Sequence, residues 1–348
     1  MYDEHFGLTT RPFQLTPDPR FWFSTATHRK AMAYLGYGLA QGEGFIVITG
    51  EIGAGKTTLA GHLVETVDPQ RLSVVRLVST AIHADDLLRT VATALGVDPH
   101  GLAKAQLLTA IERSLHAVAR TGRRTLLVVD EVQALPVDSL EELRMLSNFQ
   151  GSGHALLQIL LLGQPEFRDR LHGSDALEQL RQRVIAIHHL DPMGEDEVAD
   201  YIAHRLSVAG WQGRPDFADD AFAALHQGSG GVPRRLNHLA GRTMLAAAVE
   251  GYELIDADLV RSVLGDLQAD LPMPNAPTVV EPVETVVPDA GPAPADAALA
   301  ARVAALESRI EQQDAALRRV LTLLVDWVDA DQSRAALAAE PAAWEAAA

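Results

Sequence analysis

One short segment has the residue types and the spacing that grip a triphosphate. Residues 50–57 read GEIGAGKT and match the pattern G-x-x-x-x-G-K-T. Glycine at positions 53 and 55 lets the backbone bend around phosphate oxygens, because no Cβ stands in the way. The backbone amides of residues 53–58 then point at those oxygens from a helix N-terminus. The pattern predicts the following phosphate-binding residues: Gly50, Gly53, Ala54, Gly55, Lys56, Thr57 and Thr58.

Three side chains of this segment have separate predicted roles. Lys56 reaches the β- and γ-phosphates, the Thr57 hydroxyl ligates Mg²⁺, and Thr58 adds a contact to the α-phosphate. The apolar run 45–49 precedes the segment and a helical stretch follows it, which is the context that the pattern requires. A chance glycine turn is the competing interpretation, and a second motif argues against it.

That second motif is an apolar run that ends in two carboxylates. Residues 125–131 read TLLVVDE, so Asp130 and Glu131 follow a predicted buried strand. Asp130 is predicted to hold the water shell of Mg²⁺, and Glu131 to orient and deprotonate the attacking water. A solvated acidic turn is the alternative for this pair alone. A glutamate beside the γ-phosphate also argues against a small-molecule kinase, which must exclude water from that site.

Short apolar runs alternate with helical stretches around these motifs. This alternation predicts an α/β fold in which helices cover both faces of a parallel sheet. The expected strands are 45–49, 72–78, 125–129, 156–162 and 184–188, and the expected helices are 57–66, 84–95, 103–120, 137–148 and 174–182.

The character of the sequence changes along the chain and divides it into segments. Residues 191–268 have helical patterns near 195–209, 218–227, 233–249 and 256–267, with no convincing strand. Proline is dense from 272 to 295, which is typical of a linker. The predicted segments are 1–44, an N-terminal linker and adenine-side segment; 45–190, the P-loop core; 191–268, a small all-helical lid; 269–296, a Pro/Ala-rich linker; 297–330, a helical coiled-coil candidate; and 331–348, a disordered tail.

The last helical segment has apolar residues at alternating spacings of four and three. This short heptad pattern allows two interpretations, a helix that docks on its own core or a helix that associates with a second copy or a partner. The positions are Leu299, Val303, Leu306, Ile310, Gln313, Leu317, Val320 and Leu324. Removal of residues 297–348 is expected to spare nucleotide binding and to weaken association.

Composition narrows the class of protein. The 348 residues are 47% hydrophobic, carry a formal net charge of −17 and include no cysteine, so disulfides and cysteine-based zinc sites are excluded. An acidic chain disfavours a broad nucleic-acid surface. Residues 1–20 lack the pattern of a signal peptide, and the apolar runs are shorter than a membrane span, which favours a cytoplasmic protein.

Further motifs carry a resemblance to a known family. They are FGL at 6–8, RPF at 11–13, TPDPR at 16–20, VDEVQ at 129–133, LRMLSN at 143–148, GQPE at 163–166 and GVPR at 231–234. Together with the loop at 50–57, they resemble the ExeA-type secretion ATPases of the AAA+ superfamily. Within that family, the chain is most similar to ATPases associated with exosortase (XrtA/PEP-CTERM) exopolysaccharide systems. The resemblance covers about residues 1–268.

The resemblance implies roles for three more residues. Gln164 occupies the sensor-1 position, although a glutamine before proline also suits a turn. Arg183 looks like the arginine finger that acts on the ATP of a neighbouring subunit, with Arg181 as the runner-up and solvated helix-end arginines as the alternative. Arg234 looks like sensor 2 in the lid, with Arg235 as the alternative if the helix phase differs by one residue.

Three functions fit these observations. The first is an ATP-hydrolysing assembly factor that works as a homo-oligomer, a ring or a dimer, with a secretion or exopolysaccharide-export partner. Through that partner it would lie at the periphery of the inner membrane. The second is a nucleotide-gated switch or scaffold with little turnover. The third, a DNA-bound ATPase of the transposition or replication-initiation type, is disfavoured by the acidic charge and by the lack of a basic recognition helix.

Overall fold

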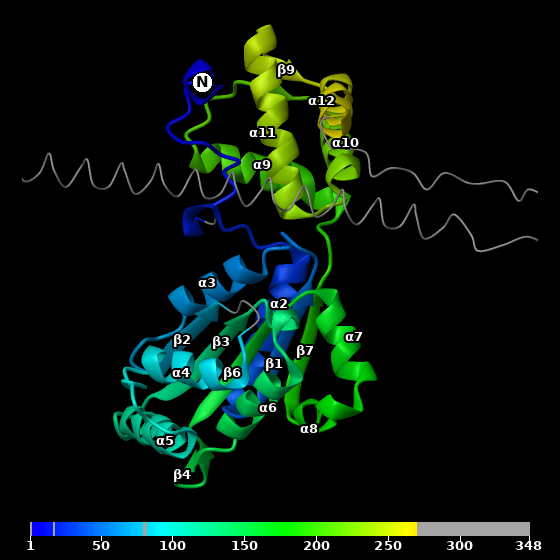
Figure 1. Cartoon of the computed structure of the whole chain (residues 1–348). Helices are drawn as coiled ribbons and strands as arrows, with labels where there is room; N and C mark the ends of the chain where they lie inside the picture. Colours follow the sequence, from blue (N-terminus) through cyan, green and yellow to red (C-terminus); the bar gives the residue numbers. More distant parts are fainter. Residues whose placement is uncertain (1, 17, 79–81, 270–348) are drawn as a thin grey trace, which may run out of the picture. The chain divides into compact units, whose positions relative to one another are not determined.

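A parallel sheet of five strands organises the chain. The structure is a computed structural model that describes residues 2–16, 18–78 and 82–269 (Figure 1). All neighbouring strands of the sheet are parallel, in the order β2-β3-β6-β1-β7. The predicted α/β P-loop fold is thereby confirmed for the described residues. The strands are β1 (Phe45–Gly50), β2 (Leu72–Val78), β3 (Arg124–Asp130), β6 (Leu157–Gly163) and β7 (Val184–Leu190).

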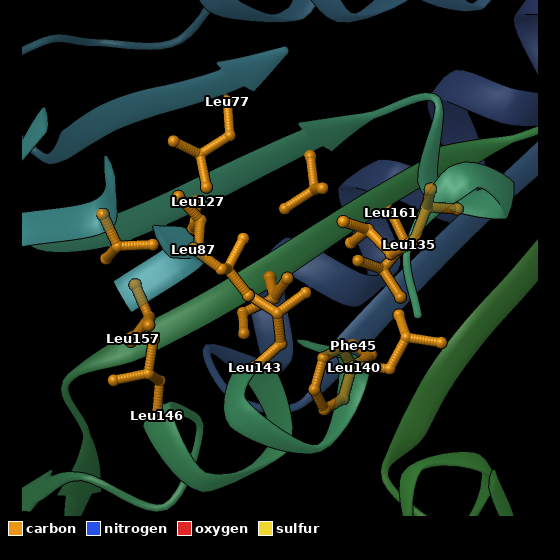
Figure 2. Close-up of a cluster of buried hydrophobic side chains, with 14 of the residues drawn as sticks. Phe45, Leu77, Leu87, Leu127, Leu135, Leu140, Leu143, Leu146, Leu157 and Leu161 are labelled. Carbon is orange, nitrogen blue, oxygen red and sulfur yellow. The ribbon is translucent and has the colours of Figure 1, made fainter. Parts of the chain in front are cut away.

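Side chains that alternate along each strand enter two separate cores. Phe45 and Val47 of β1 belong to one cluster of buried residues, whereas Ile46 and Ile48 belong to another on the opposite face. Every residue of β1 and β6 is buried, as expected for central strands covered on both faces. Figure 2 shows part of the first cluster, in which Phe45 and the leucines of neighbouring strands and helices point toward one another.

Helices cover both faces of the sheet. The face that carries Ile46 packs against α2 (Ala26–Gln41) and α3 (Lys56–Thr66), which contribute Leu35 and Leu59 to that core. The other face packs against the remaining helices of this part of the chain. They are α4 (Ala84–Ala94), α5 (Lys104–Arg120), α6 (Val137–Leu146), α7 (Pro165–Gly173) and α8 (Glu178–Arg181).

One predicted helix is wrong. The expected helix at 174–182 is replaced by a short 3₁₀ turn at Asp175–Leu177 and the four-residue α8, and α7 precedes them where no helix was expected. Pro165 occupies the first turn of α7, where its missing N–H costs nothing and its fixed φ suits a helix. A two-residue hairpin, β4 (Gln150–Gly151) with β5 (His154–Ala155), precedes β6.

Four helices form the second part of the described chain. They are α9 (Glu195–Val208), α10 (Asp219–Ser229), α11 (Pro233–Glu250) and α12 (Ala257–Ala269). Glycine in the left-handed region ends α10, because Gly230 has φ 61°. The expectation of no strand here needs a correction, since β8 (Asp216–Phe217) and β9 (Leu254–Ile255) form a short parallel pair.

The N-terminal segment packs mainly with these four helices, and its Trp22 packs against the Ile46 core of the sheet. The segment contains helix α1 (Tyr2–His5) and the 3₁₀ turn η1 (Pro19–Phe21). Its aromatic residues enter the buried cluster of α9 to α12, called the lid core below. The Thr9 backbone N–H also donates to the Ala209 carbonyl at the end of α9, at 2.8 Å. The buried residues that this segment adds to the lid core are Phe6, Leu8, Phe13 and Phe21.

The predictions for the C-terminal part lie outside the described residues. They concern the linker from residue 270, the coiled-coil candidate at 297–330 and the tail at 331–348. Within the ranges 2–16, 18–78 and 82–269, no helix combines the length and the apolar character that crossing a bilayer requires.

Candidate functional site

The loop between β1 and α3 has the bent backbone that the glycine spacing predicts. Gly53 has φ 87° and Gly55 has φ 96°, a region that residues with a Cβ rarely adopt. A Cβ on Gly53 would lie 2.4 Å from the Cβ of Arg234, and a Cβ on Gly55 would lie 2.8 Å from Nε2 of His28. Close approach from the lid and from α2 therefore adds a second reason for glycine at both positions.

Lys56 begins α3 and is buried at the base of this loop. Its Nζ donates to the Gly50 carbonyl at 2.7 Å and to the Glu51 carbonyl at 3.0 Å. Burial lowers the pKa of Lys56, and the nearby carboxylates of Glu131 and Asp130 oppose that shift. The ammonium thus lies on the inner side of the loop, with two acidic residues near it.

Thr57 and Asp130 meet across the space between α3 and the end of β3. The Thr57 hydroxyl donates to Oδ2 of Asp130 at 2.7 Å. A hydroxyl and a carboxylate oxygen at hydrogen-bond distance are hard ligands of the kind that Mg²⁺ takes in phosphate sites. The two residues predicted to serve the metal therefore lie together, and their chemistry fits that ion.

Glu131 faces away from Asp130 and is held by two amides. Its Oε2 accepts from Nε2 of Gln133 at 2.5 Å and from Nε2 of Gln164 at 3.2 Å. Burial acts to raise the pKa of Glu131, but these hydrogen bonds and the charges of Lys56 and Arg234 outweigh it and lower the pKa. The carboxylate is therefore ionised at neutral pH and lies where it can accept a proton.

Gln164 follows β6 and precedes α7. Besides its contact with Glu131, its backbone N–H donates to Oε1 of Gln133 at 3.0 Å. The structure thus brings Gln164 to the predicted catalytic carboxylate. Gln133, for which no role was predicted, contacts both residues.

The lid contributes residues of α9 and α11 to the pocket above the loop. The Arg234 backbone N–H donates to the Gly53 carbonyl at 3.2 Å, so the first turn of α11 touches the phosphate loop. Arg234 lines the pocket, whereas Arg235 does not. Tyr201 and Arg205 of α9 and Asn237 of α11 complete this wall, and the Tyr201 hydroxyl donates to Asn237 at 2.8 Å.

The N-terminal segment forms the opposite wall of the pocket, with an aromatic surface. Trp22 stacks on His62 at 4.4 Å between ring centroids and meets His28 edge-on at 5.0 Å. The Arg205 guanidinium lies over the Phe21 ring, 4.7 Å from its centroid. Thr16 and Asp18 also line the pocket. The only sequence signal for this wall is the density of aromatic residues between 13 and 23.

His28 is a buried group of the pocket that the sequence did not single out. Its Nδ1 lies 2.7 Å from the Thr25 hydroxyl, and its Nε2, directed at Gly55, has no hydrogen-bond partner among the described residues. Burial lowers the pKa of His28 to about 4, against a smaller opposing effect of the Ala54 backbone. The ring is therefore neutral at physiological pH.

Arg183 lies apart from all these residues. It precedes β7, and its carbonyl accepts from the backbone N–H of Phe45 at the start of β1, at 3.0 Å. The phosphate loop follows the carboxyl end of β1, whereas Arg183 lies at the opposite end of the sheet, where β1 and β7 begin. Its guanidinium donates to the Ser147 hydroxyl at 3.2 Å and remains exposed. Arg181 instead donates to the carbonyls of Leu171 and His172 at 3.2 and 2.9 Å.

Comparisons with known proteins identify an AAA domain and a curated relative. A family model described as an AAA domain matches residues 39–171. General secretion pathway protein A of Aeromonas hydrophila is 35% identical over 261 residues, which cover 74% of this chain and 47% of that protein. The chain thus spans about half the length of the curated relative that it matches.

Solved structures share the architecture at low sequence identity. The ORC2 protein of Aeropyrum pernix, solved as ADPNP–ADP complexes, has a TM-score of 0.53 and 16% identity, over 74% of this chain and 71% of that one. Cdc6p of Pyrobaculum aerophilum has a TM-score of 0.56 and 16% identity, over 78% of this chain and 74% of that one. At these identities the likeness establishes the fold alone.

The family assignment follows from these matches and the geometry together. An AAA domain implies nucleotide binding, and the predicted phosphate-binding loop lines the pocket described above. The closer assignment to exosortase-associated ATPases stays a prediction. The AAA match and the 35% identity over 74% of this chain support the assignment to the ExeA-type AAA+ ATPases.

Proposed function

We propose that this chain hydrolyses ATP with Mg²⁺ and that hydrolysis drives or regulates assembly of a secretion or export system. The observation that carries the proposal is the Glu131 carboxylate, ionised and held by two amides beside the Lys56 loop. A nucleotide binder without turnover needs no such base at this position.

The phosphates of ATP would be held by the loop and by two cations. Amides at the start of α3 and the Lys56 ammonium stabilise the β- and γ-phosphates, and Arg234 reaches them from the lid. Mg²⁺ would be held by Thr57 and Asp130, and when bound it supplies positive charge to the phosphate oxygens. The lid contact between Arg234 and Gly53 then links occupancy of the loop to the position of α11.

Glu131 and Gln164 would act on the attacking water. The Glu131 carboxylate accepts a proton from that water as its oxygen bonds to the γ-phosphorus, and the bond from phosphorus to the ADP oxygen breaks. Gln164, whose amide already touches Glu131, orients the carboxylate and the water. The products are ADP and inorganic phosphate.

The base of ATP would bind between the N-terminal segment and the lid. The pocket continues from the phosphate loop to Trp22 and Phe21 on one side and to Tyr201 and Asn237 on the other. Aromatic side chains suit a flat purine ring, and the buried amide of Asn237 offers polar contacts. A base bound there would contact residues of the range 1–44, which supports the predicted adenine-side segment.

Arg183 would complete the site of a neighbouring subunit, which makes the active form a homo-oligomer. Its position at the amino ends of the strands supports this role, because the guanidinium is exposed and lies apart from the phosphate loop of the same chain. Arg181 is the weaker candidate, because its guanidinium is bonded to two carbonyls of its own chain.

The proposed setting is the cytoplasmic face of the inner membrane, where a partner would hold the protein. The 35% identity to a protein named for general secretion supports a secretion role. The exopolysaccharide branch is supported by the motif resemblance. The heptad pattern at 297–330 is a candidate contact for the partner or for a second copy.

Phosphate release from Mg-ATP by the full chain, compared with Lys56→Ala, tests the activity. The wild type should release phosphate only with Mg²⁺, and Lys56→Ala should lose both nucleotide affinity and release. Lys104→Ala, which removes an exposed lysine at the start of α5, is the matched control and should behave as wild type. Equal phosphate release from Lys56→Ala and from the control would refute the proposed site.

A further inference from the structure

The side-chain amide of Gln133 makes two hydrogen bonds beside Glu131, the predicted catalytic carboxylate. Nε2 of Gln133 donates to Oε2 of Glu131 at 2.5 Å, and Oε1 of Gln133 accepts the backbone N–H of Gln164 at 3.0 Å. The reverse orientation of the amide would set an oxygen against the carboxylate and a donor against an N–H. Electrostatics therefore fixes the direction of this side chain.

The backbone around Gln133 is held from α7. Arg170 donates through NH1 to the Leu135 carbonyl at 2.8 Å and to the Gln133 carbonyl at 3.4 Å. Val132 and Leu135, on either side, are buried in the core. Gln133 is therefore anchored, so that its amide has little freedom to leave the carboxylate.

Glu131 itself needs such support, because its backbone is in an unusual region. Its φ is 53°, in the left-handed region that costs a residue with a Cβ about 1–2 kcal/mol. Its side chain leaves the strand end toward Gln133 and Gln164, whereas Asp130 faces Thr57. The contacts beyond β3 thus decide where the carboxylate points.

We propose that Gln133 is a positioning residue for ATP hydrolysis, which orients the Glu131 carboxylate and ties it to the start of α7. This inference rests on the proposed function and deepens it. Because one amide contacts both Glu131 and the Gln164 backbone, a shift of α7 changes the orientation of the carboxylate. At its other end α7 is bonded to Arg181, two residues before the exposed Arg183. Hydrogen bonds through Arg181, α7 and Gln133 thus connect the place where a neighbour would dock at Arg183 with Glu131.

The proposal predicts a specific pattern of kinetic changes. Without the Gln133 amide, Glu131 keeps one side-chain donor, at the longer distance of 3.2 Å. Turnover should fall at least about tenfold, because a misplaced base contributes less to proton transfer. ATP affinity should stay unchanged, since Gln133 does not line the nucleotide pocket.

Gln133→Met tests this pattern in the full chain. Methionine has nearly the shape of glutamine but no amide, so the buried surroundings are kept. Gln179→Met, at an exposed position on α8, is the matched control. The measurements are kcat, KM, the equilibrium affinity for ATP, and the melting temperature. In the Glu131→Gln background, Gln133→Met should cost no further activity, because the carboxylate that it positions is gone.

The outcomes separate this inference from the proposed function. Turnover of Gln133→Met within about twofold of wild type, below the smallest loss ascribed to a general base, would overturn the positioning role. An equal loss of ATP affinity would also overturn it, since it would make Gln133 a binding residue. A further loss in the Glu131→Gln background would reveal an effect independent of the carboxylate and contradict the proposal. A wild-type chain without phosphate release would overturn both proposals together.

Discussion

Gly53 lies so close to Arg234 that a residue with a Cβ at position 53 would clash with it. Gly53→Ala would add a Cβ 2.4 Å from the Cβ of Arg234, besides straining a residue at φ 87°. We expect ATP affinity to fall at least about tenfold, because the loop and α11 cannot keep their contact. Gly96→Ala is the matched control, since Gly96 has φ 77° and open space around it. It should lose about 1 kcal/mol of stability and no ATP affinity. Equal affinity losses in both variants would show that strain alone matters.

His28 makes the stability of the chain depend on pH. Its pKa is lowered from 6.5 to about 4 by burial, so between these values the unfolded chain binds a proton that the folded chain does not. The stability given by the neutral ring is complete above pH 6.5 and is lost as the pH falls toward 4, by at most about 1.4 kcal/mol per pH unit. Urea unfolding of His28→Gln should lack this part of the slope. His100→Gln, at an exposed position, should keep it. Equal slopes in wild type and His28→Gln would contradict the assignment.

At the residue scale, the sequence could predict only those site residues that adjacent residues identify. The loop at 50–57 and the pair Asp130–Glu131 are recognisable because their neighbours in sequence supply the context. Besides local contacts with Glu131 and Thr25, Gln133 and His28 contact residues 31 and 27 positions away, which their residue types do not signal. Only the folded arrangement reveals them.

At the element scale, the N-terminal segment joins the lid to the nucleotide pocket. Arg205 is buried; its Nε donates to the Pro12 carbonyl at 2.6 Å and its NH1 to the Tyr201 hydroxyl at 3.2 Å. Lysine cannot make both bonds and also lie flat over Phe21. Arg205→Lys should therefore cost about 2 kcal/mol of unfolding free energy and weaken ATP binding. Arg261→Lys, at an exposed site on α12, should change neither quantity in urea unfolding and ATP titration. Wild-type behaviour of Arg205→Lys would contradict this role of the segment.

The same scale shows why some elements escaped prediction. The strands of the sheet were predicted within two residues at each end, because buried runs bounded by turn residues give a strong signal. The helix α7 was missed because Gln164 and Pro165 also suit a turn, and because its short, charged sequence offers only Phe167 and Leu171 as an apolar face. The sequence could not predict on which helices residues 2–23 pack, because aromatic residues indicate that they are buried but not which surface covers them.

At the scale of the whole molecule, the proposed role of Arg183 in a neighbouring site needs a second copy, because Arg183 lies apart from its own loop. Lys56→Ala lacks a working loop but keeps Arg183, and Arg183→Ala has the opposite defect. An equal mixture of the two should recover about a quarter of the wild-type rate per subunit, if neighbours pair at random and the arginine acts in trans. Arg168→Ala, on α7, should be fully active and serves as the control. A mixture no faster than the sum of its components would mean that Arg183 does not act in trans.

ATP affinity and single-turnover phosphate release, compared between wild type and Glu131→Gln, test whether this carboxylate is the catalytic base. If Glu131 deprotonates the attacking water, the variant binds Mg-ATP as tightly as wild type and releases phosphate at least about a hundredfold more slowly. Unchanged phosphate release from Glu131→Gln, at unchanged affinity, would contradict the central claim that this carboxylate prepares the water for attack.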